Sequence, residues 1–376
     1  MHPVTSSSTA SAPNAPVTPA ARSARAARTA EESAAANTRD LAARSRADGW
    51  DEGPVVIALE VGGARIRGLA MAADGTRLHS GHRRTPVGHG PDAVMETVLE
   101  YAADLARRYT PVAAGIAVPG LVEEAAGTAV FAAHLGWRRV PVRRWLTEEL
   151  GIPVAFAHDV RAGGFAEARL GAGRRSRSFL FVPIGTGIGA SMVHDGRPRA
   201  YTDARTGELG HVVVRPGGDP CPCGGQGCLE TVASAAAIAR RYRLLSGETR
   251  ITVREIQHRA EAGDPAAARV WHEAVEALAD GLSPMIDLLD PEHVIIGGAL
   301  SHAGKTYCDS LHGALATRLT GRRPPRIVPS RFGRRAGAIG AALLAQRLRP
   351  AERAPRGAGT HRLPAGGTPS VTGAFT

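Results

Sequence analysis

The strongest chemical signal in the sequence is a group of soft metal ligands. His211 precedes three closely spaced cysteines, Cys221, Cys223 and Cys228. One imidazole and three thiolates make a complete tetrahedral set, the arrangement that Zn²⁺ adopts in structural sites. Glycines among the cysteines let a short loop fold its sulfurs around one ion. Because all four positions are filled, the sequence predicts a structural zinc site; the alternative is a set of buried or free thiols.

Two glycine-rich turns each follow a strand-like apolar run. They are Gly62-Gly63 and Gly185-Thr186-Gly187. The backbone N–H groups of such turns can line a concavity that binds an anion, because no Cβ blocks the approach. The two turns are therefore candidates to hold phosphate groups from two sides.

A carboxylate stands where an α/β fold is expected to place its ligand. Asp159 follows the apolar run 154–157 and precedes a helical pattern. The carboxyl ends of strands face the ligand crevice in such folds, and a carboxylate there can act as a general base on a hydroxyl group. The alternative is a structural N-cap, a position that Asp favours.

Further polar side chains flank the predicted zinc ligands. Glu208 precedes His211, and Glu230 follows Cys228. Carboxylates and an imidazole fixed by a metal loop suit a polyol, whose hydroxyl groups need both donors and acceptors. The alternative for each carboxylate is a surface charge or a helix cap.

The elements that must position these residues show a weak internal repeat. Residues 55–59 and 65–70 read as strands around the first glycine turn and are followed by an Asp-Gly turn. Residues 179–182 and 190–193 repeat the pattern around the second glycine turn. The repeat predicts two related lobes that face each other across a cleft; the alternative is two hairpins of independent origin.

The remaining pattern alternates strands and helices, which predicts an α/β fold with largely parallel sheets. Helices are expected at 92–109, 142–150, 162–170 and 265–289, and strands at 113–118, 154–157 and 294–296. Pro265 fits the first turn of the longest helix, with Asp264 as its N-cap.

Composition limits the class of protein. The chain has 376 residues and a net charge of +11, but Lys305 is its only lysine, which points to a bias toward GC-rich codons. Richness in arginine is then weak evidence for a nucleic-acid partner. Without a long apolar run or a secretory signal, we expect a cytoplasmic protein that does not span a membrane. Residues 1–52 and 350–376 carry few large apolar residues and are expected to be disordered.

At this point the sequence resembles the ROK family of sugar kinases and repressors. The resemblance covers nearly all of residues 53–349, and its most specific part is the segment from Gly207 to Glu230. It implies an actin-like, ribonuclease H-like ATPase fold with two lobes, a central cleft and a zinc-binding loop at 211–230. It places the lobes at 53–160 and 161–349, and it implies a homodimer or homotetramer.

The resemblance also implies roles for individual residues. Asp159 would be the base that accepts the proton of the attacking sugar hydroxyl. The sugar would be bound by Gly120, His134, His158, Glu208, His211 and Glu230. ATP, with Mg²⁺, would be bound by Glu60, Gly62, Gly63, Arg65, Gly185, Thr186, Gly187, Gly297 and Gly298. Zinc would be bound by the four ligands named above.

Several positions depart from the family's usual pattern. Glu60 replaces an Asp and Ala64 replaces a Thr in the first glycine loop, while His134, His158 and Arg161 each replace an Asn. The leading hypothesis is ATP-dependent phosphorylation of a sugar or sugar-like polyol. The alternative is a catalytically weak sugar-binding sensor without a DNA-binding domain.

Overall fold

The computed structural model describes residues 55–200 and 207–348. The segments expected to be disordered, 1–52 and 350–376, lie outside the described residues. Within the described part, none of the helices combines the length and the apolar character needed to cross a bilayer.

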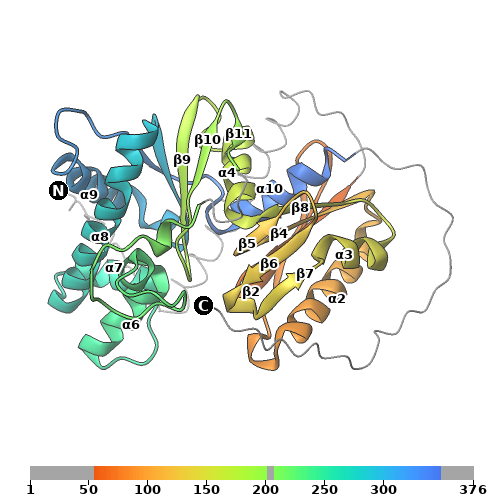
Figure 1. Cartoon of the computed structure of the whole chain (residues 1–376), viewed down its shortest axis with the longest axis horizontal. Helices are drawn as coiled ribbons and strands as arrows, with labels where there is room; N and C mark the ends of the chain where they lie inside the picture. Colours follow the sequence, from red (N-terminus) through yellow and green to blue (C-terminus); the bar gives the residue numbers. More distant parts are fainter. Residues whose placement is uncertain (1–54, 201–206, 349–376) are drawn as a thin grey trace, which may run out of the picture.

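Two five-stranded sheets with the same strand order form the framework (Figure 1). The first runs β3 (Arg77–Arg84), β2 (Arg65–Met71), β1 (Val56–Val61), β4 (Ala113–Val118), β8 (Val154–His158). The second runs β11 (Arg197–Pro198), β10 (Ser191–His194), β9 (Ser178–Ile184), β12 (His293–Gly298), β13 (Arg326–Pro329). This shared order confirms the internal repeat that the two hairpins predicted.

Both sheets are mixed, so the expectation of largely parallel sheets is wrong. In each sheet the first three strands in chain order pair antiparallel with one another. The remaining two strands lie parallel to the strand beside them. The physical reason is the length of the connections. A tight turn can join only antiparallel neighbours, whereas a parallel pair needs a crossover connection.

Two central helices lie between the sheets (Figure 1). α4 (Asp159–Leu170) packs on β9 and β10, and α10 (Ala336–Ala345) packs on β1 and β4. Buried side chains from both sheets and both helices form one hydrophobic cluster. The last helix of the described residues, α10, thus returns to the sheet of the first lobe.

The outer face of each sheet is covered by its own helices. α2 (Pro91–Tyr109) and α3 (Val142–Leu150) share a core with the first sheet. The second sheet packs against α6 (Ala235–Ser246), α7 (Val253–Glu261), α8 (Pro265–Leu289) and α9 (Gly304–Ala316). The chain therefore stacks in five layers, helix, sheet, helix, sheet, helix.

The predicted elements agree closely with the observed ones. The longest helix ends at Leu289 as expected, and Asp264 caps it by accepting hydrogen bonds from the N–H groups of Ala266 and Ala267. α4 begins at Asp159, three residues before the expected start at 162. A small sheet, β5 (Leu121–Glu123), β6 (Thr128–Ala132), β7 (Trp137–Val140), adds an edge to the first lobe.

Candidate active site between the two lobes

Parallel strands bring the first two carboxylates together. Glu60 lies near the carboxyl end of β1, in register with Ala117 of β4, which pairs in turn with Ala157 of β8. Asp159 follows β8 directly as the first residue of α4. His158, not Asp159, occupies the N-cap, so the N-cap alternative for Asp159 is wrong. The Val160 N–H donates to Asp159 Oδ1 at 2.7 Å and fixes the carboxylate.

Burial changes the proton affinity of both carboxylates. It raises the pKa of Asp159 to about 6, against the lowering effects of the Val160 N–H, Arg161 and Arg67. It raises the pKa of Glu60 to about 7, although Arg67 lowers it and the Asp159 charge adds to the rise. A carboxylate with a pKa near neutrality is well matched to accept a proton at neutral pH.

Arg67 and α10 hold Glu60 in place. Arg67 Nη1 lies 3.3 Å from Glu60 Oε1, and the Ala338 N–H donates to Glu60 Oε2 at 3.2 Å. Gly337 leaves the space that the Glu60 side chain fills, since a Cβ there would lie 2.9 Å from Glu60 Cδ. The hairpin β1–β2 sets the ion pair, because Glu60 and Arg67 are cross-strand partners.

His158 is a buried neutral imidazole beside the candidate base. Its Nε2 lies 3.6 Å from Asp159 Oδ1, and its side chain is 4% exposed. Burial and Arg161 lower the pKa of His158 to about 3. Its Nδ1 has no hydrogen-bond partner among the described residues.

The second lobe supplies the other carboxylates. Glu230, in α5 (Leu229–Ala233), accepts a hydrogen bond from the Ile188 N–H at Oε2, at 3.0 Å. Burial, followed by the charges of Asp159 and Glu230, raises the pKa of Glu208, while His211 lowers it. Asp159, Glu208 and Glu230 therefore share one electrostatic environment.

His134 makes one of the contacts between the lobes at this site. His134 of the first lobe lies with Nε2 4.0 Å from Glu230 Oε1. A Cβ on Gly63, in the first glycine turn, would lie 3.5 Å from His134 Cβ. His134 therefore stands between the glycine turn of one lobe and a carboxylate of the other.

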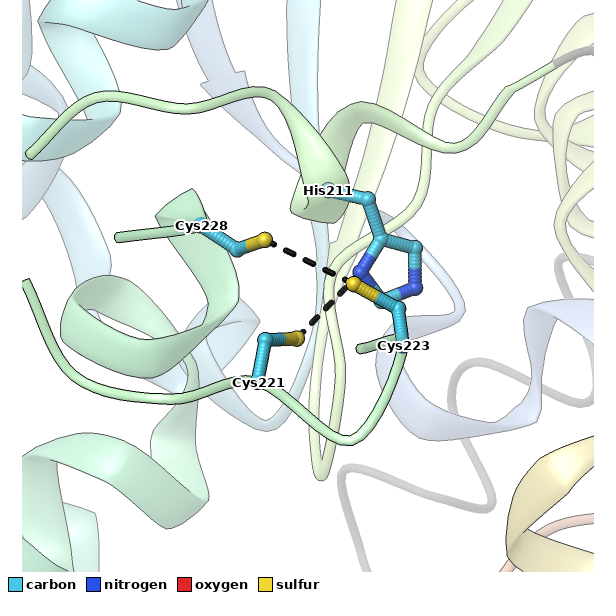
Figure 2. A group of neighbouring side chains, drawn as sticks. All are labelled: His211, Cys221, Cys223 and Cys228. Atoms are coloured by element: carbon cyan, nitrogen blue, oxygen red, sulfur yellow. Dashed lines mark hydrogen bonds between the residues drawn. The ribbon is translucent and has the colours of Figure 1, made fainter. Parts of the chain in front are cut away.

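The four predicted metal ligands converge (Figure 2). Their ligand atoms all lie within 4.8 Å of one another. Cys223 Sγ and Cys228 Sγ are 3.7 Å apart, and Cys221 Sγ is 3.6 Å from His211 Nδ1. A tetrahedral zinc site has edges of about 3.8 Å between two sulfurs and about 3.6 Å between sulfur and nitrogen, from its usual bond lengths. The side chains therefore fit that ion.

The imidazole of His211 connects this cluster to the carboxylates. Its Nδ1 faces Cys221, and its Nε2 lies 3.6 Å from Glu208 Oε2. A ligand bound at Nδ1 fixes the tautomer that carries the proton on Nε2. The loop backbone supports this placement, because the Leu229 N–H donates to the Val212 carbonyl and ties the histidine segment to α5.

Glycines of the predicted phosphate turns have different surroundings. Gly185 has open space where a Cβ would point, as a backbone anion site requires. Gly187 instead makes room for Glu230, since a Cβ there would lie 2.3 Å from Glu230 Oε2. Gly62 closes a hairpin turn by donating to the Arg65 carbonyl at 3.0 Å. Thr186 and Arg65 are exposed.

Other predicted glycines are explained by packing. Gly120 has φ +87°, and a Cβ there would lie 2.3 Å from the Phe131 carbonyl oxygen. Gly297 faces the ring of Phe181, and Gly298, at φ +68°, lies against the Ile184 carbonyl. A side chain at any of these three positions would collide with neighbouring atoms.

Sequence reasoning missed two residues at this site, Arg67 and Glu124. The hairpin register contained a signal for Arg67, because a turn centred on Gly63-Ala64 sets Glu60 opposite Arg67. Glu124 carried no signal, because it reaches His158 and Arg161 from the turn between β5 and β6 only in the folded chain.

The chain is similar in sequence to members of one protein family. The profile of the ROK family matches residues 56–348. A glucokinase from Streptomyces coelicolor is 26% identical over 315 residues, which cover 79% of this chain and 99% of the relative. A xylose repressor from Caldicellulosiruptor bescii is 28% identical over 216 residues, 54% of each protein.

A solved structure resembles the whole body of the chain. It is a ROK family glucokinase from Streptomyces griseus in complex with glucose and AMPPNP. Its TM-score is 0.72 at 27% identity, with 78% of this chain and 99% of that chain covered. The mixed sheets and this neighbour fit the actin-like ATPase fold expected from the sequence.

Proposed function

The chain belongs to the ROK family, and we propose that it is an ATP-dependent kinase of a sugar or sugar-like polyol. The observation that carries the proposal is the position of Asp159. This partly buried carboxylate interacts electrostatically with Glu60, which precedes the first glycine turn, and with Glu208 of the second lobe. A base between a phosphate site and a polyol site is what phosphoryl transfer to a hydroxyl needs.

In the proposed reaction Asp159 accepts the proton of the attacking hydroxyl. The hydroxyl oxygen forms a bond to the γ-phosphorus as the bond from that phosphorus to the ADP oxygen breaks. Glu208, Glu230 and the Nε2–H of His211 would orient the other hydroxyl groups. His134 would complete the acceptor site from the first lobe.

The donor side would be formed by the two glycine turns. Gly62, Gly63, Gly185, Thr186 and Gly187 would hold the ATP phosphates, and Gly297 and Gly298 would face the adenosine. Glu60 is the carboxylate suited to bind Mg²⁺ or its water, and the ion would neutralise phosphate charge. Arg65 and Arg67 add positive charge beside these groups.

We also propose a structural Zn²⁺ at His211, Cys221, Cys223 and Cys228. The support is the agreement of two edges of the cluster, Cys221 Sγ to His211 Nδ1 and Cys223 Sγ to Cys228 Sγ, with tetrahedral coordination. The ion would tie the histidine segment to α5 and so fix Glu208 and Glu230 relative to each other.

A second candidate function is sugar sensing without phosphoryl transfer. The observation that favours it is the donor loop, where Ala64 is exposed and lacks the hydroxyl that would contact phosphate. Arg161 in the acceptor region adds a cation where the family usually has an amide. Retention of Asp159 in a buried, activated state favours the kinase.

The test is ADP release with Mg²⁺-ATP across hexoses, N-acetyl amino sugars and cyclitols. We expect one acceptor class to drive turnover, and Asp159→Asn to lower it by about 10²–10⁴-fold while sugar still binds. Sugar binding by calorimetry without turnover on any acceptor would contradict the kinase and support the sensor. Full turnover in Asp159→Asn would contradict the base assignment.

We further propose a homodimer or homotetramer in solution. Light scattering coupled to size-exclusion chromatography tests it, and a mass equal to one chain at micromolar concentration would contradict it.

A further inference from the structure

Glu124 makes two contacts at the start of α4. Its Oε1 accepts a hydrogen bond from the His158 N–H at 2.9 Å and another from Arg161 Nε at 2.9 Å. Glu124 comes from the turn between β5 and β6, in the small sheet of the first lobe. One carboxylate oxygen therefore joins that sheet to the residues on both sides of Asp159.

The first contact is made at His158, the N-cap residue of α4. The first four N–H groups of a helix have no partner within it, and the His158 side chain makes no capping hydrogen bond. Glu124 satisfies the His158 N–H from outside the helix. A negative charge at a helix N-terminus is also favourable, because of the helix dipole.

The second contact balances a buried cation. The Arg161 side chain is 7% exposed, and its guanidinium lies close enough to lower the pKa of Asp159, which burial raises. A buried cation is stable only when it is paired. Glu124 supplies the compensating charge, which weakens the pull of Arg161 on Asp159.

We propose that Glu124 is a positioning residue for the acceptor side of the active site. It holds the N-terminus of α4 and neutralises Arg161, and through both it keeps Asp159 in place as an effective base. Arg161 and Glu124 act as a pair. The Glu124 carboxylate, from the β5–β6 turn, allows the Arg161 guanidinium to be buried beside Asp159. The inference rests on the proposed kinase function.

The charged and titratable groups that face Asp159 define the test. They are His158 and Arg161 beside it, Glu60 of β1, Arg67 of β2 and Glu208 of the second lobe. Glu124→Gln retains an acceptor oxygen but removes the negative charge that faces Arg161 Nε. Arg161→Gln removes the cation. The two substitutions should therefore shift the pKa of Asp159 in opposite directions: Glu124→Gln should lower it, and Arg161→Gln should raise it.

The measurement is the pH profile of kcat for the full-length protein. We expect Glu124→Gln to move the acid limb down by about one pH unit and to lower the plateau, since opposite charges act on this scale. We expect Arg161→Gln to move the limb up, and the double variant to return toward wild type. Glu123→Gln, an exposed neighbour in β5, is the matched control and should leave the profile unchanged.

A second measurement does not depend on turnover. Carboxyl-¹³C labelling of aspartate follows the Asp159 titration by NMR, with Asp159→Asn to assign the signal. Shifts of the Asp159 pKa in opposite directions in the two single variants support the inference. Absence of turnover on every acceptor would contradict only the proposed kinase function. Unchanged Asp159 titration, or shifts of the same sign in both variants, overturns the inference.

Discussion

Burial raises the pKa of two carboxyl groups at the candidate site, those of Asp159 and Glu60. The pKa of Asp159 is raised from 3.8 to about 6, and that of Glu60 from 4.5 to about 7. Desolvation is the largest cause in both, and Arg67 opposes it in both. The raised pKa means that the ionised carboxylate lowers the stability of the fold, a cost typical of a functional site.

The first prediction concerns stability and pH at Asp159. Because its pKa is higher in the folded than in the unfolded state, its ionisation destabilises the fold above about pH 6. The penalty disappears as the pH falls from about 6 toward 3.8. We expect Asp159→Asn to be more stable than wild type by about 2 kcal/mol at neutral pH, after allowance for its 24% exposed side chain.

Urea unfolding of both proteins at about pH 8 and about pH 4 measures this difference. The gain should shrink to near zero at the lower pH. A variant less stable than wild type at the higher pH would contradict the raised pKa. The same pKa predicts that acceptor-dependent turnover falls as the pH drops through about 6, because the base becomes protonated.

At the scale of elements, small residues let the two central helices approach. A Cβ on Gly340 of α10 would lie 1.8 Å from the Ala162 carbonyl oxygen of α4. A Cβ on Gly115 of β4 would lie 2.1 Å from the Ala341 carbonyl oxygen. These contacts set the distance between Asp159, at the start of α4, and Glu60, which accepts from the Ala338 N–H of α10.

The second prediction compares two helical glycines. Gly340→Ala must force the helices apart, and we expect a loss of about 1–3 kcal/mol, typical of overpacking. Gly313→Ala in α9 is the matched control, because nothing lies within 4 Å of its Cβ position. The control should gain about 0.5–1 kcal/mol. Equal effects of the two substitutions in urea unfolding would argue against close packing of α4 and α10.

The third prediction concerns the metal loop. We expect Cys223→Ser to lose zinc, because serine does not supply the thiolate that completes the tetrahedral set. Cys308→Ser, the same change at a buried cysteine of α9 outside the cluster, is the control. Elemental analysis should find about one zinc per chain in wild type and in the control. Full zinc content in Cys223→Ser would exclude it as a ligand.

At the scale of the molecule, the candidate site is assembled from both lobes. Glu60, His134 and Asp159 come from the first half of the chain, whereas Glu208 and Glu230 come from the second. One contact between these two groups joins His134 Nε2 to Glu230 Oε1, at 4.0 Å. A substrate that contacts both lobes is therefore expected to link their relative positions to its own binding.

The fourth prediction is reciprocal coupling between acceptor and nucleotide. Each ligand that draws the lobes together should favour the other, by about 5- to 150-fold, the usual range of such coupling. Calorimetric titration of the best acceptor, with and without a non-hydrolysable ATP analogue, measures this factor. The reverse titration must give the same value. Equal affinities with and without the partner ligand would show that the lobes bind independently.

The sequence by itself determined many of the elements and the internal repeat, and it supplied most of the candidate site residues. Periodicity located α2, α3 and α8, since their apolar faces follow the helical period. The spacing of Cys221, Cys223 and Cys228 indicates a metal loop without reference to the fold. Local pattern carries such information because secondary structure and short loops depend on neighbours in sequence.

Only the tertiary structure decided the electrostatics and the long-range partners. The mixed sheet pairing, the contact of Glu124 with His158 and Arg161, and the return of α10 to the first sheet join residues far apart in the chain. The raised pKa values of Asp159 and Glu60 follow from burial among those residues. Desolvation and charge pairing depend on distance in space, and the folded chain alone sets that distance.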